Sequence, residues 1–340
     1  MTSRQKSAQL SRRKTPWDAA EERTPLENFI RDAIKDNYNL HHPELQNTDE
    51  HILINSYIPE RCPFCGSIDI VRNGRNSNFV QYYKCKTCLF RFNPLTGTIF
   101  QDRKISILQW VEYCRNLFHF VSTNANSWNN KNAFTTSNYW MNKIFLLLND
   151  YQASIVLSGK IWLDETYYPL MKSDLKKDDE GNNLCGLSSN QMCIGVICTM
   201  EQIVCIYEGN GKSNGDVTYQ SFLHHIEPNS TLIHDKDKSH GLLVDELCLN
   251  NITYDASEIK KLDDELNPLN RINEVHNLLK KFLNVHSGFN RNFLQDYLNL
   301  FAFIMNPPSD KLDKIKILLD KAFFTKRVLK YRDFYAKKQR

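Results

Sequence analysis

The sequence predicts an α/β fold, in which a mixed sheet with flanking helices is preceded by a small cysteine-bearing module and a helical region. Two observations predict this class. From residue 159 onward, short runs rich in β-branched and aromatic residues alternate with stretches of helical spacing. Before them, four of the ten cysteines form two Cys-x-x-Cys pairs. At 340 residues the chain also exceeds the usual size of one core, so we expect more than one domain.

Composition sets the broad class of the protein. The chain is 41% hydrophobic and 24% charged, as expected for a folded protein. No run approaches the ~18 consecutive apolar residues that span a bilayer, and the N-terminus lacks the apolar core of a signal peptide. We therefore expect a cytoplasmic protein with no membrane partner. The net charge of +4 is too small to identify a polyanionic partner, and the basic runs at both ends are either solvated tails or nucleic-acid contacts.

Residues 1–58 are predicted to be a basic leader followed by a short helix. The first 20 or so are polar and basic without periodicity, which is typical of disorder. Pro25–Asp36 has apolar residues at helical spacing and should form an amphipathic helix. We assign this part no chemistry.

Residues 59–100 predict a zinc ribbon. Cys62 and Cys65 are followed, after nineteen residues, by Cys85 and Cys88. Each pair lets two thiolates converge on one ion, and four protein thiolates make a closed, structural zinc site. A redox Cys-x-x-Cys or scattered core cysteines would not explain two pairs at this separation.

The segment between the two cysteine pairs should form a hairpin, with strands at Ile68–Arg72 and Val80–Lys84. Basic and aromatic side chains alternate along and after it, and they would suit phosphate contact or form an ordinary solvated rim. These residues are Arg72, Arg75, Lys84, Lys86 and Arg91, with Tyr82, Tyr83 and Phe90.

Residues 101–152 are predicted to be a helical, DNA-binding region. Ile105–Phe120 and about Ser137–Asn149 have amphipathic spacing, and Ser137 or one of the two threonines before it should cap the second helix. A polar, asparagine-rich loop separates them. Such a pair either forms a helix-turn-helix, whose second helix enters the major groove of DNA, or simply packs together.

Residues 153–308 carry two acidic residues at corresponding places. The strand Gly159–Tyr168 holds Asp164, and the strand Ser230–Asp235 ends with Asp235. A carboxylate set into an apolar strand is costly unless a cation or a hydrogen-bond network receives it. Two such strands suggest one divalent metal site between them.

The order of elements in this region predicts the sheet. We expect strands at 159–168, 191–198 and 202–207, a helix at 216–226, a strand at 232–235, a helix at 241–249, a strand at 252–254, and then helices. This is the order of an RNase H-like domain, in which the first and fourth strands lie side by side, so Asp164 and Asp235 would meet. Residues 309–340 should form a basic helical tail.

At these residues the chain resembles a known family. It is similar, from residue 62 to about 305, to bacterial insertion-sequence transposases of the DDE type with an N-terminal zinc ribbon, the ISXO2-like group. CPFCG, YYKCKTC and F-x-x-LTGT-x-F match the ribbon and its exit, LDETYY the first acidic strand, and IHD followed by KSH the second. NRINEVHNLLK resembles the third motif, and GFNRNFLQDYLNLFAFIMN the closing helical block.

The resemblance implies a transposase that binds terminal inverted repeats and target DNA, cuts and rejoins strands, and acts as a homo-oligomer on DNA. It implies two catalytic Mg²⁺ ions besides the structural zinc. Asp164 would bridge both ions, Asp235 would hold one, Asn273 would complete the shell, and Lys280 would contact phosphate or orient the nucleophile.

Asn273 departs from the family pattern. Many members read Asn, two residues, Glu, six residues, Lys, and here the glutamate position holds Asn273. Asn273 and Lys280 are seven residues apart, almost two helical turns, so they share a face. Glu274 lies about 100° around the helix and would replace Asn273 only if the helix were rotated.

Two other functions remain open at this point. A catalytically inactive, transposase-derived zinc-ribbon DNA-binding protein would have lost the third metal-binding oxygen, and Asn273 is the residue that decides this. A nuclease that cleaves without joining would share every residue named above.

Overall fold

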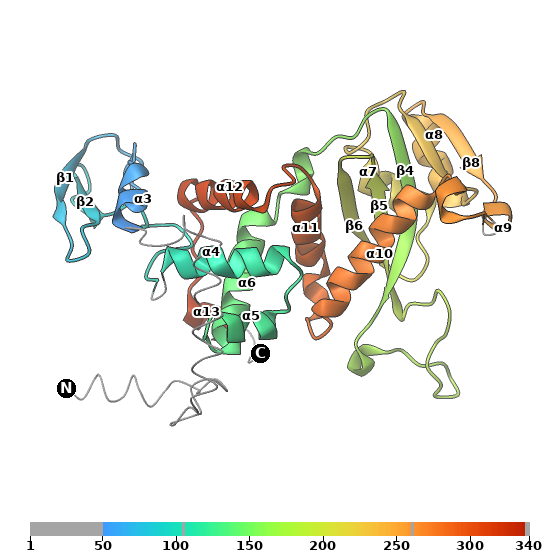
Figure 1. Ribbon diagram of the computed structural model, residues 1–340, viewed down its shortest axis with the longest axis horizontal. Helices are drawn as coiled ribbons and strands as arrows, with labels where there is room; N and C mark the ends of the chain where they lie inside the picture. Colours follow the sequence, from blue (N-terminus) through green and yellow to red (C-terminus); the bar gives the residue numbers. More distant parts are fainter. Residues whose placement is uncertain (1–49, 104–105, 260–261, 337–340) are drawn as a thin grey trace. The chain divides into compact units, whose positions relative to one another are not determined.

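The computed structural model describes residues 50–103, 106–259 and 262–336 (Figure 1). The leader expected at 1–20 and the helix expected at Pro25–Asp36 lie outside these residues. The chain divides into two compact units, Met1–Lys143 with Lys311–Arg340, and Ile144–Asp310. Within the described ranges, no helix combines the length and the apolar character needed to cross a membrane.

The first unit begins with helix α3 (Glu50–Ser56) and a small antiparallel sheet in the order β1-β2-β3. Its strands are β1 (Ile70–Arg75), β2 (Gln81–Cys85) and β3 (Arg91–Phe92). The predicted hairpin is therefore present, with each strand shifted by one to three residues and with a short third strand added. Tyr83 and Phe92 are buried with two of the cysteines and form the small core of this ribbon module, residues 59–100.

Three helices follow, α4 (Ile107–Phe118), α5 (Thr123–Asn129) and α6 (Phe134–Leu148). The loop predicted between two helices was wrong in part, because α5 occupies most of it. Ser122 caps α5 by accepting a hydrogen bond from the Ala125 amide. Asn126 is fully buried, and its side chain donates to the Tyr113 carbonyl and accepts from Asn116. The asparagines that resembled loop residues thus form an internal hydrogen-bond network.

Helix α6 begins at Phe134, three residues before the predicted start. Ser137, expected as a possible cap, lies inside the helix and donates to the Thr123 carbonyl instead. The C-terminal helices α12 (Lys311–Phe324) and α13 (Tyr331–Ala336) complete the first unit. In that unit Phe323 stacks on Tyr57, with ring centroids 3.9 Å apart.

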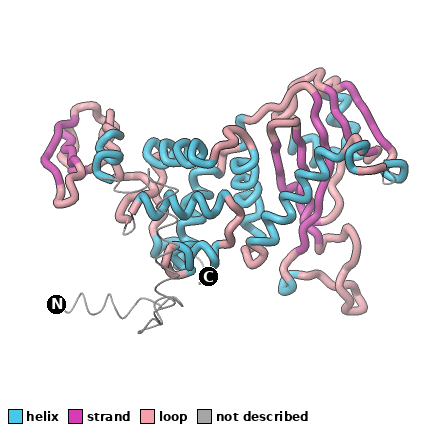
Figure 2. Tube along the Cα trace, viewed as in Figure 1, coloured by secondary structure: helices cyan, strands magenta, loops and turns pink. Residues whose placement is uncertain are grey.

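The second unit contains a five-stranded mixed sheet in the order β6-β5-β4-β7-β8 (Figure 2). The strands are β4 (Lys160–Pro169), β5 (Gln191–Cys198), β6 (Ile203–Asn210), β7 (Thr231–Asp235) and β8 (Asn250–Tyr254). The central strand β4 is antiparallel to β5 and parallel to β7. The predicted α/β class with a mixed sheet is confirmed, and the first and fourth strands of the unit are neighbours as expected.

Helices cover both faces of this sheet. α7 (Gly215–Phe222) and α8 (Gly241–Glu246) pack against one face, and α10 (Asn270–Val285) packs against the other. α11 (Leu294–Met305) contacts β6, and α9 (Ala256–Ile259) follows β8. Short 3-10 turns connect the elements: η2 (Gln152–Ser154), η3 (Lys172–Asp174), η4 (Lys238–His240), η5 (Asp264–Leu266) and η6 (Arg291–Phe293).

Strand alternation gives the two faces of β4 different partners. Ile161 and Leu163 point into an apolar core that includes residues of α7 and α8. The alternate residues face α10: the Trp162 indole donates to the Pro268 carbonyl just before that helix, at 2.8 Å, and the Tyr168 hydroxyl donates to the Leu283 carbonyl within it. A residue on this second face is therefore presented to α10.

Gly195 in β5 lies opposite Glu165 of β4, and it has no room for a side chain. An added Cβ would lie 2.6 Å from Glu208 Oε1 and 2.8 Å from Cε2 of Phe222, far inside ordinary contact. Glycine is therefore required here by close packing, not by its backbone conformation.

Candidate active site and cysteine centre

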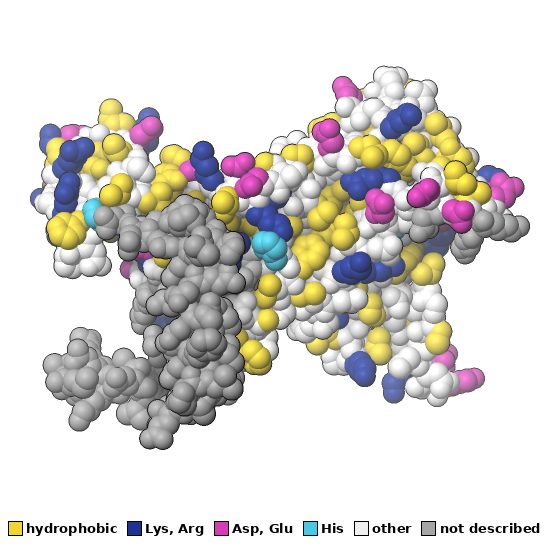
Figure 3. Space-filling model, in the orientation of Figure 1, with side chains coloured by type: hydrophobic (Ala, Val, Ile, Leu, Met, Phe, Trp, Pro, Cys, Tyr) yellow, Lys and Arg dark blue, Asp and Glu magenta, His cyan; other side chains and the backbone are white. Residues whose placement is uncertain are grey.

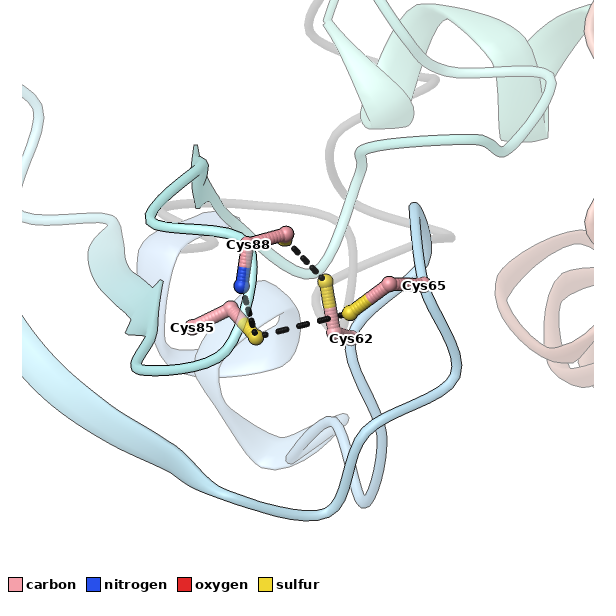
Figure 4. A group of neighbouring side chains, drawn as sticks. All are labelled: Cys62, Cys65, Cys85 and Cys88. Carbon is pink, nitrogen blue, oxygen red and sulfur yellow. Dashed lines mark hydrogen bonds between the residues drawn. The ribbon is translucent and has the colours of Figure 1, made fainter.

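The four cysteines predicted as zinc ligands converge in the ribbon module (Figure 4). The Sγ atoms of Cys62 and Cys88 are 3.6 Å apart, as are those of Cys65 and Cys85, and all four lie within 4.8 Å of one another. Two thiolates bound tetrahedrally to zinc at ~2.3 Å are about 3.8 Å apart. The four cysteines could therefore hold a metal such as zinc.

Local backbone geometry supports this convergence. Gly66, with φ +73°, follows the second cysteine and lets the chain turn in a conformation that other residues rarely adopt. The Cys88 amide donates to Cys85 Sγ at 3.5 Å. This hydrogen bond is the largest of the effects that lower the pKa of the Cys85 thiol below its ordinary value, which favours the thiolate that binds metals.

The ribbon module also exposes cations and aromatic rings. Figure 3 shows lysine and arginine side chains in dark blue among hydrophobic ones in yellow on this module. Arg91 lies over the Tyr82 ring at 4.0 Å, and Phe64 and Phe90 are exposed with ring centroids 5.0 Å apart. All five basic residues singled out from the sequence around the hairpin are exposed. They are available to contact phosphate groups.

In the second unit, the strand register brings the two predicted acidic residues to the same level. β4 and β7 are parallel, with Trp162 paired to Ile233, and two residues further each strand reaches its aspartate. Asp164 and Asp235 therefore leave the sheet on the same face, the one that α10 covers. The Glu165 amide donates to Asp164 Oδ1 at 2.9 Å, and the Asp237 amide donates to Asp235 Oδ1 at 3.0 Å, so backbone donors orient both carboxylates.

The surroundings of Asp164 disfavour its ionised form. Burial, followed by the charges of Asp235 and Glu165, raises the pKa of the Asp164 carboxyl to about 7. Two carboxylates at the same level of adjacent strands repel each other unless a cation lies between them. A divalent ion would stabilise both in their charged form, and oxygen ligands of this kind suit Mg²⁺.

Helix α10 carries the remaining predicted site residues. Asn273 is half-buried, whereas Lys280 is exposed. Glu274 is also exposed, and it accepts a hydrogen bond from Asn270 and lies 3.9 Å from Arg271 on its own helix. Glu274 is thus engaged along the outer surface of the helix.

His276, which the sequence analysis did not single out, lies between Asn273 and Lys280 on this helix. It is three residues after the first and four before the second, so all three share one face. Its Nδ1 atom is 3.7 Å from Asp164 Oδ2. This contact joins the α10 face that bears Asn273 and Lys280 to the aspartate of β4.

A second group of residues missed from the sequence lies on the opposite face of β4. Glu165 Oε1 is 3.1 Å from His240 Nε2, the Nδ1 atoms of His240 and His234 are 2.7 Å apart, and His234 Nε2 is 2.8 Å from Asn251 Oδ1. Burial lowers the pKa of His234. Burial acts in the same direction on His240, but the hydrogen bond and the charge of Glu165 outweigh it, so the pKa of His240 is raised. Glu165 and His240 belong to the DE and KSH segments that the sequence pattern pointed to. The sequence does not show, however, on which face of the sheet such polar side chains lie.

His234, Asp235 and His240 have ligand atoms close enough to share an ion. The ring nitrogens of both histidines, however, already pair with each other, with Glu165 and with Asn251. An ion bound by them would have to break this chain of hydrogen bonds. Asp235 is the only one of these three residues that offers a carboxylate, and its Oδ1 accepts from the Asp237 amide.

Comparisons with known proteins give no family assignment. No family model matches the chain, and no curated protein matches it. Similar solved structures include the simian T-cell lymphotropic virus intasome in complex with PP2A regulatory subunit B56 gamma, with 12% identity and a TM-score of 0.28 over 56% of this chain and 65% of that chain. The match therefore spans less than two thirds of that chain.

Two Mos1 structures are also similar. The Mos1 strand transfer complex has 10% identity and a TM-score of 0.23, over 62% of this chain and 78% of that chain. The pre-cleavage Mos1 transpososome has 8% identity and a TM-score of 0.23, over 84% of this chain and 96% of that chain. TM-scores this low do not establish a common fold.

Proposed function

We propose that this protein is a DNA transposase of the DDE type whose second unit contains an RNase H-like catalytic domain. One observation carries the proposal: Asp164 and Asp235 lie on adjacent parallel strands, at the same level and on the same face. Their mutual repulsion is part of what raises the pKa of Asp164, and a divalent cation would remove it. The strand order β6-β5-β4-β7-β8 agrees with this domain type.

The proposed site uses four residues. Asp164 and Asp235 hold divalent ions, Asn273 completes the shell with its amide oxygen, and Lys280 contacts the phosphate or orients the nucleophile. Two Mg²⁺ ions, when bound, would activate water or a 3′-hydroxyl and stabilise the leaving oxygen. The protein orients both carboxylates through the backbone amides of Glu165 and Asp237.

DNA recognition is assigned to residues 59–152, most of which belong to the first unit. We propose a zinc ribbon at residues 59–100 and a helical DNA-binding region at 101–152, which would contact the inverted repeats, with the catalytic domain at 153–308 acting on the cleaved end and target DNA. The exposed cations and aromatic rings of the ribbon module support phosphate contact. We propose that the chain acts as a homo-oligomer on DNA.

A strand-transfer assay tests this proposal. Labelled duplexes that cover the inverted repeats flanking the coding sequence are incubated with protein, Mg²⁺ and a supercoiled target plasmid. We expect cleaved ends and joined products from the wild type, and loss of both with Asp164→Asn or Asp235→Asn while the duplexes are still bound. Asp245→Asn, an exposed residue of α8, is the matched control and should retain activity. Cleavage that survives Asp164→Asn would refute the assignment.

The inactive DNA-binding alternative is favoured by one observation, the amide of Asn273 at the position where many members of the resembled family have a carboxylate. In the same assay this alternative predicts end binding without cleavage in the wild type. A nuclease would cleave the ends but give no joined product.

A further inference from the structure

We infer that His276 is a nitrogen ligand of the metal ion held by Asp164, and that the site therefore prefers Mn²⁺ to Mg²⁺. The inference rests on the proposed function, because it concerns the same metal site. It adds a protein ligand of a different chemical type to the oxygen ligands proposed above.

The distance between the two side chains supports a shared ion. His276 Nδ1 lies 3.7 Å from Asp164 Oδ2, which is longer than the 2.7–3.2 Å of a direct hydrogen bond. Nitrogen and carboxylate ligands bind a divalent ion such as zinc at about 2.0–2.2 Å, so two of them on one ion are separated by at most about 4 Å. The separation of these two atoms is therefore compatible with one shared ion, which would replace the hydrogen bond between His276 and the Asp164 backbone.

The burial of His276 is costly without such a role. The residue is 7% exposed, and its Nε2 atom has no hydrogen-bond partner among the described residues. Its neighbours along the buried side of α10 include Ile272, Val275 and Leu279. An apolar residue would fill this position without leaving a polar atom unpaired, so the imidazole is a costly choice for packing alone.

His286 shows that burial alone does not define the site. It follows the same helix, it is buried, and both of its ring nitrogens lack hydrogen-bond partners in the described structure. Its ring contacts are Phe282 at 5.0 Å and Tyr297 at 5.4 Å between centroids. No carboxylate among the described residues lies within ion-pair distance of it, so Asp164 is what distinguishes His276.

The metal preference follows from ligand chemistry. Mg²⁺ is a hard ion that favours oxygen ligands and retained water. Mn²⁺ accepts the same oxygen ligands but begins the series of first-row metals whose affinity for nitrogen ligands rises toward Cu²⁺. We therefore expect the wild type to bind Mn²⁺ more tightly than Mg²⁺, and His276→Gln to reduce this preference.

Electron spin echo spectroscopy of Mn²⁺ on the full chain, with the cysteine centre first loaded with zinc, tests the inference directly. We expect ¹⁴N modulation from a coordinated imidazole in the wild type, its loss in His276→Gln, and its retention in the matched control His286→Gln. His276→Gln should also weaken Mn²⁺ binding about tenfold. If the Gln variant does not fold, as judged by circular dichroism, His276→Leu keeps the apolar side of α10 and serves instead.

Two outcomes separate failure of this inference from failure of the proposed function. If Asp164→Asn weakens Mn²⁺ binding but the ¹⁴N modulation is absent in the wild type or survives the loss of His276, the metal site stands and His276 is not its ligand. If Asp164→Asn leaves Mn²⁺ affinity unchanged, the proposed metal site itself is wrong, and the inference falls with it.

Discussion

Replacing Gly195 with alanine should destabilise the second unit through a steric clash alone. The new Cβ would lie 2.6 Å from Glu208 Oε1 and 2.8 Å from Phe222 Cε2, where ordinary contacts are 3.4–4 Å. The carboxylate end of Glu208 can rotate away. Phe222 cannot, because it is fully buried in the core on that face of the sheet. Relief therefore requires a shift of Phe222 or of the β5 backbone.

The size of the effect follows from known costs of overpacking. Forcing an extra methyl group into a packed core costs about 1–3 kcal/mol. The lower chain entropy of alanine offsets about 0.4–1 kcal/mol of this. Contacts of 2.6 and 2.8 Å place Gly195→Ala toward the upper end of that cost, so the net loss is about 2 kcal/mol. Since 1 kcal/mol shifts the Tm of a domain of 150–250 residues by about 2–4 °C, differential scanning calorimetry should detect a fall of about 4–8 °C.

Gly241→Ala is the matched control. Gly241 begins α8 in a helical conformation, and a Cβ added there meets nothing within 4 Å. This variant should be as stable as the wild type or slightly more stable. The reasoning would be refuted if Gly195→Ala melted at the wild-type temperature, or if both alanine variants lost the same stability.

Three further predictions follow from the sites. Cys85→Ser should reduce zinc measured by mass spectrometry from one ion per chain to nearly none and unfold the ribbon module. Cys248 is an exposed cysteine outside the module, so Cys248→Ser should keep the zinc. An unchanged metal content in Cys85→Ser would contradict the site. Asn273→Ala should reduce strand cleavage far more than Glu274→Ala does, and the opposite ranking would move the third ligand to Glu274. Binding to inverted-repeat duplexes, measured by fluorescence anisotropy, should weaken as salt is added. Five phosphate contacts from the ribbon cations would give a slope of log affinity against log salt concentration of about −4 to −5. An affinity that does not change with salt would exclude these phosphate contacts.

The elements of the sheet could be predicted from the sequence because their hydrophobic patterns are local. The strand expected at 191–198 is β5 with the same bounds, and the strand expected at 159–168 is β4 with a shift of one residue. The predicted elements were wrong where polar residues are buried and form hydrogen bonds in the interior. Asn126 was predicted to be a loop residue because its burial and its hydrogen bonds to Tyr113 and Asn116 depend on α4. That helix is separate in the sequence but adjacent in space.

The candidate site was predictable only in part, for the same reason. Asp164 and Asp235 could be proposed as site residues because each is an acidic residue within or at the end of an apolar strand. His276 was not, because a histidine between apolar residues on a helix usually belongs to the core, and its proximity to Asp164 depends on how α10 crosses β4. The Glu165–His240 pair joins a strand to a turn 75 residues later, a contact that no local pattern encodes.

The alternation of Asp164 and Glu165 along β4 makes the chemistry of both faces depend on strand register. A slip of one residue would exchange these side chains, placing Glu165 toward α10 and Asp164 toward the paired histidines. β4 is held against such a slip by eight consecutive pairings with β5 and by β7 on its other edge. The irregularity in this part of the sheet falls instead between β5 and β6, at Cys193 and Ile194. Insertions or deletions in the edge strand β6 should thus be tolerated far better than any single-residue change of length in β4.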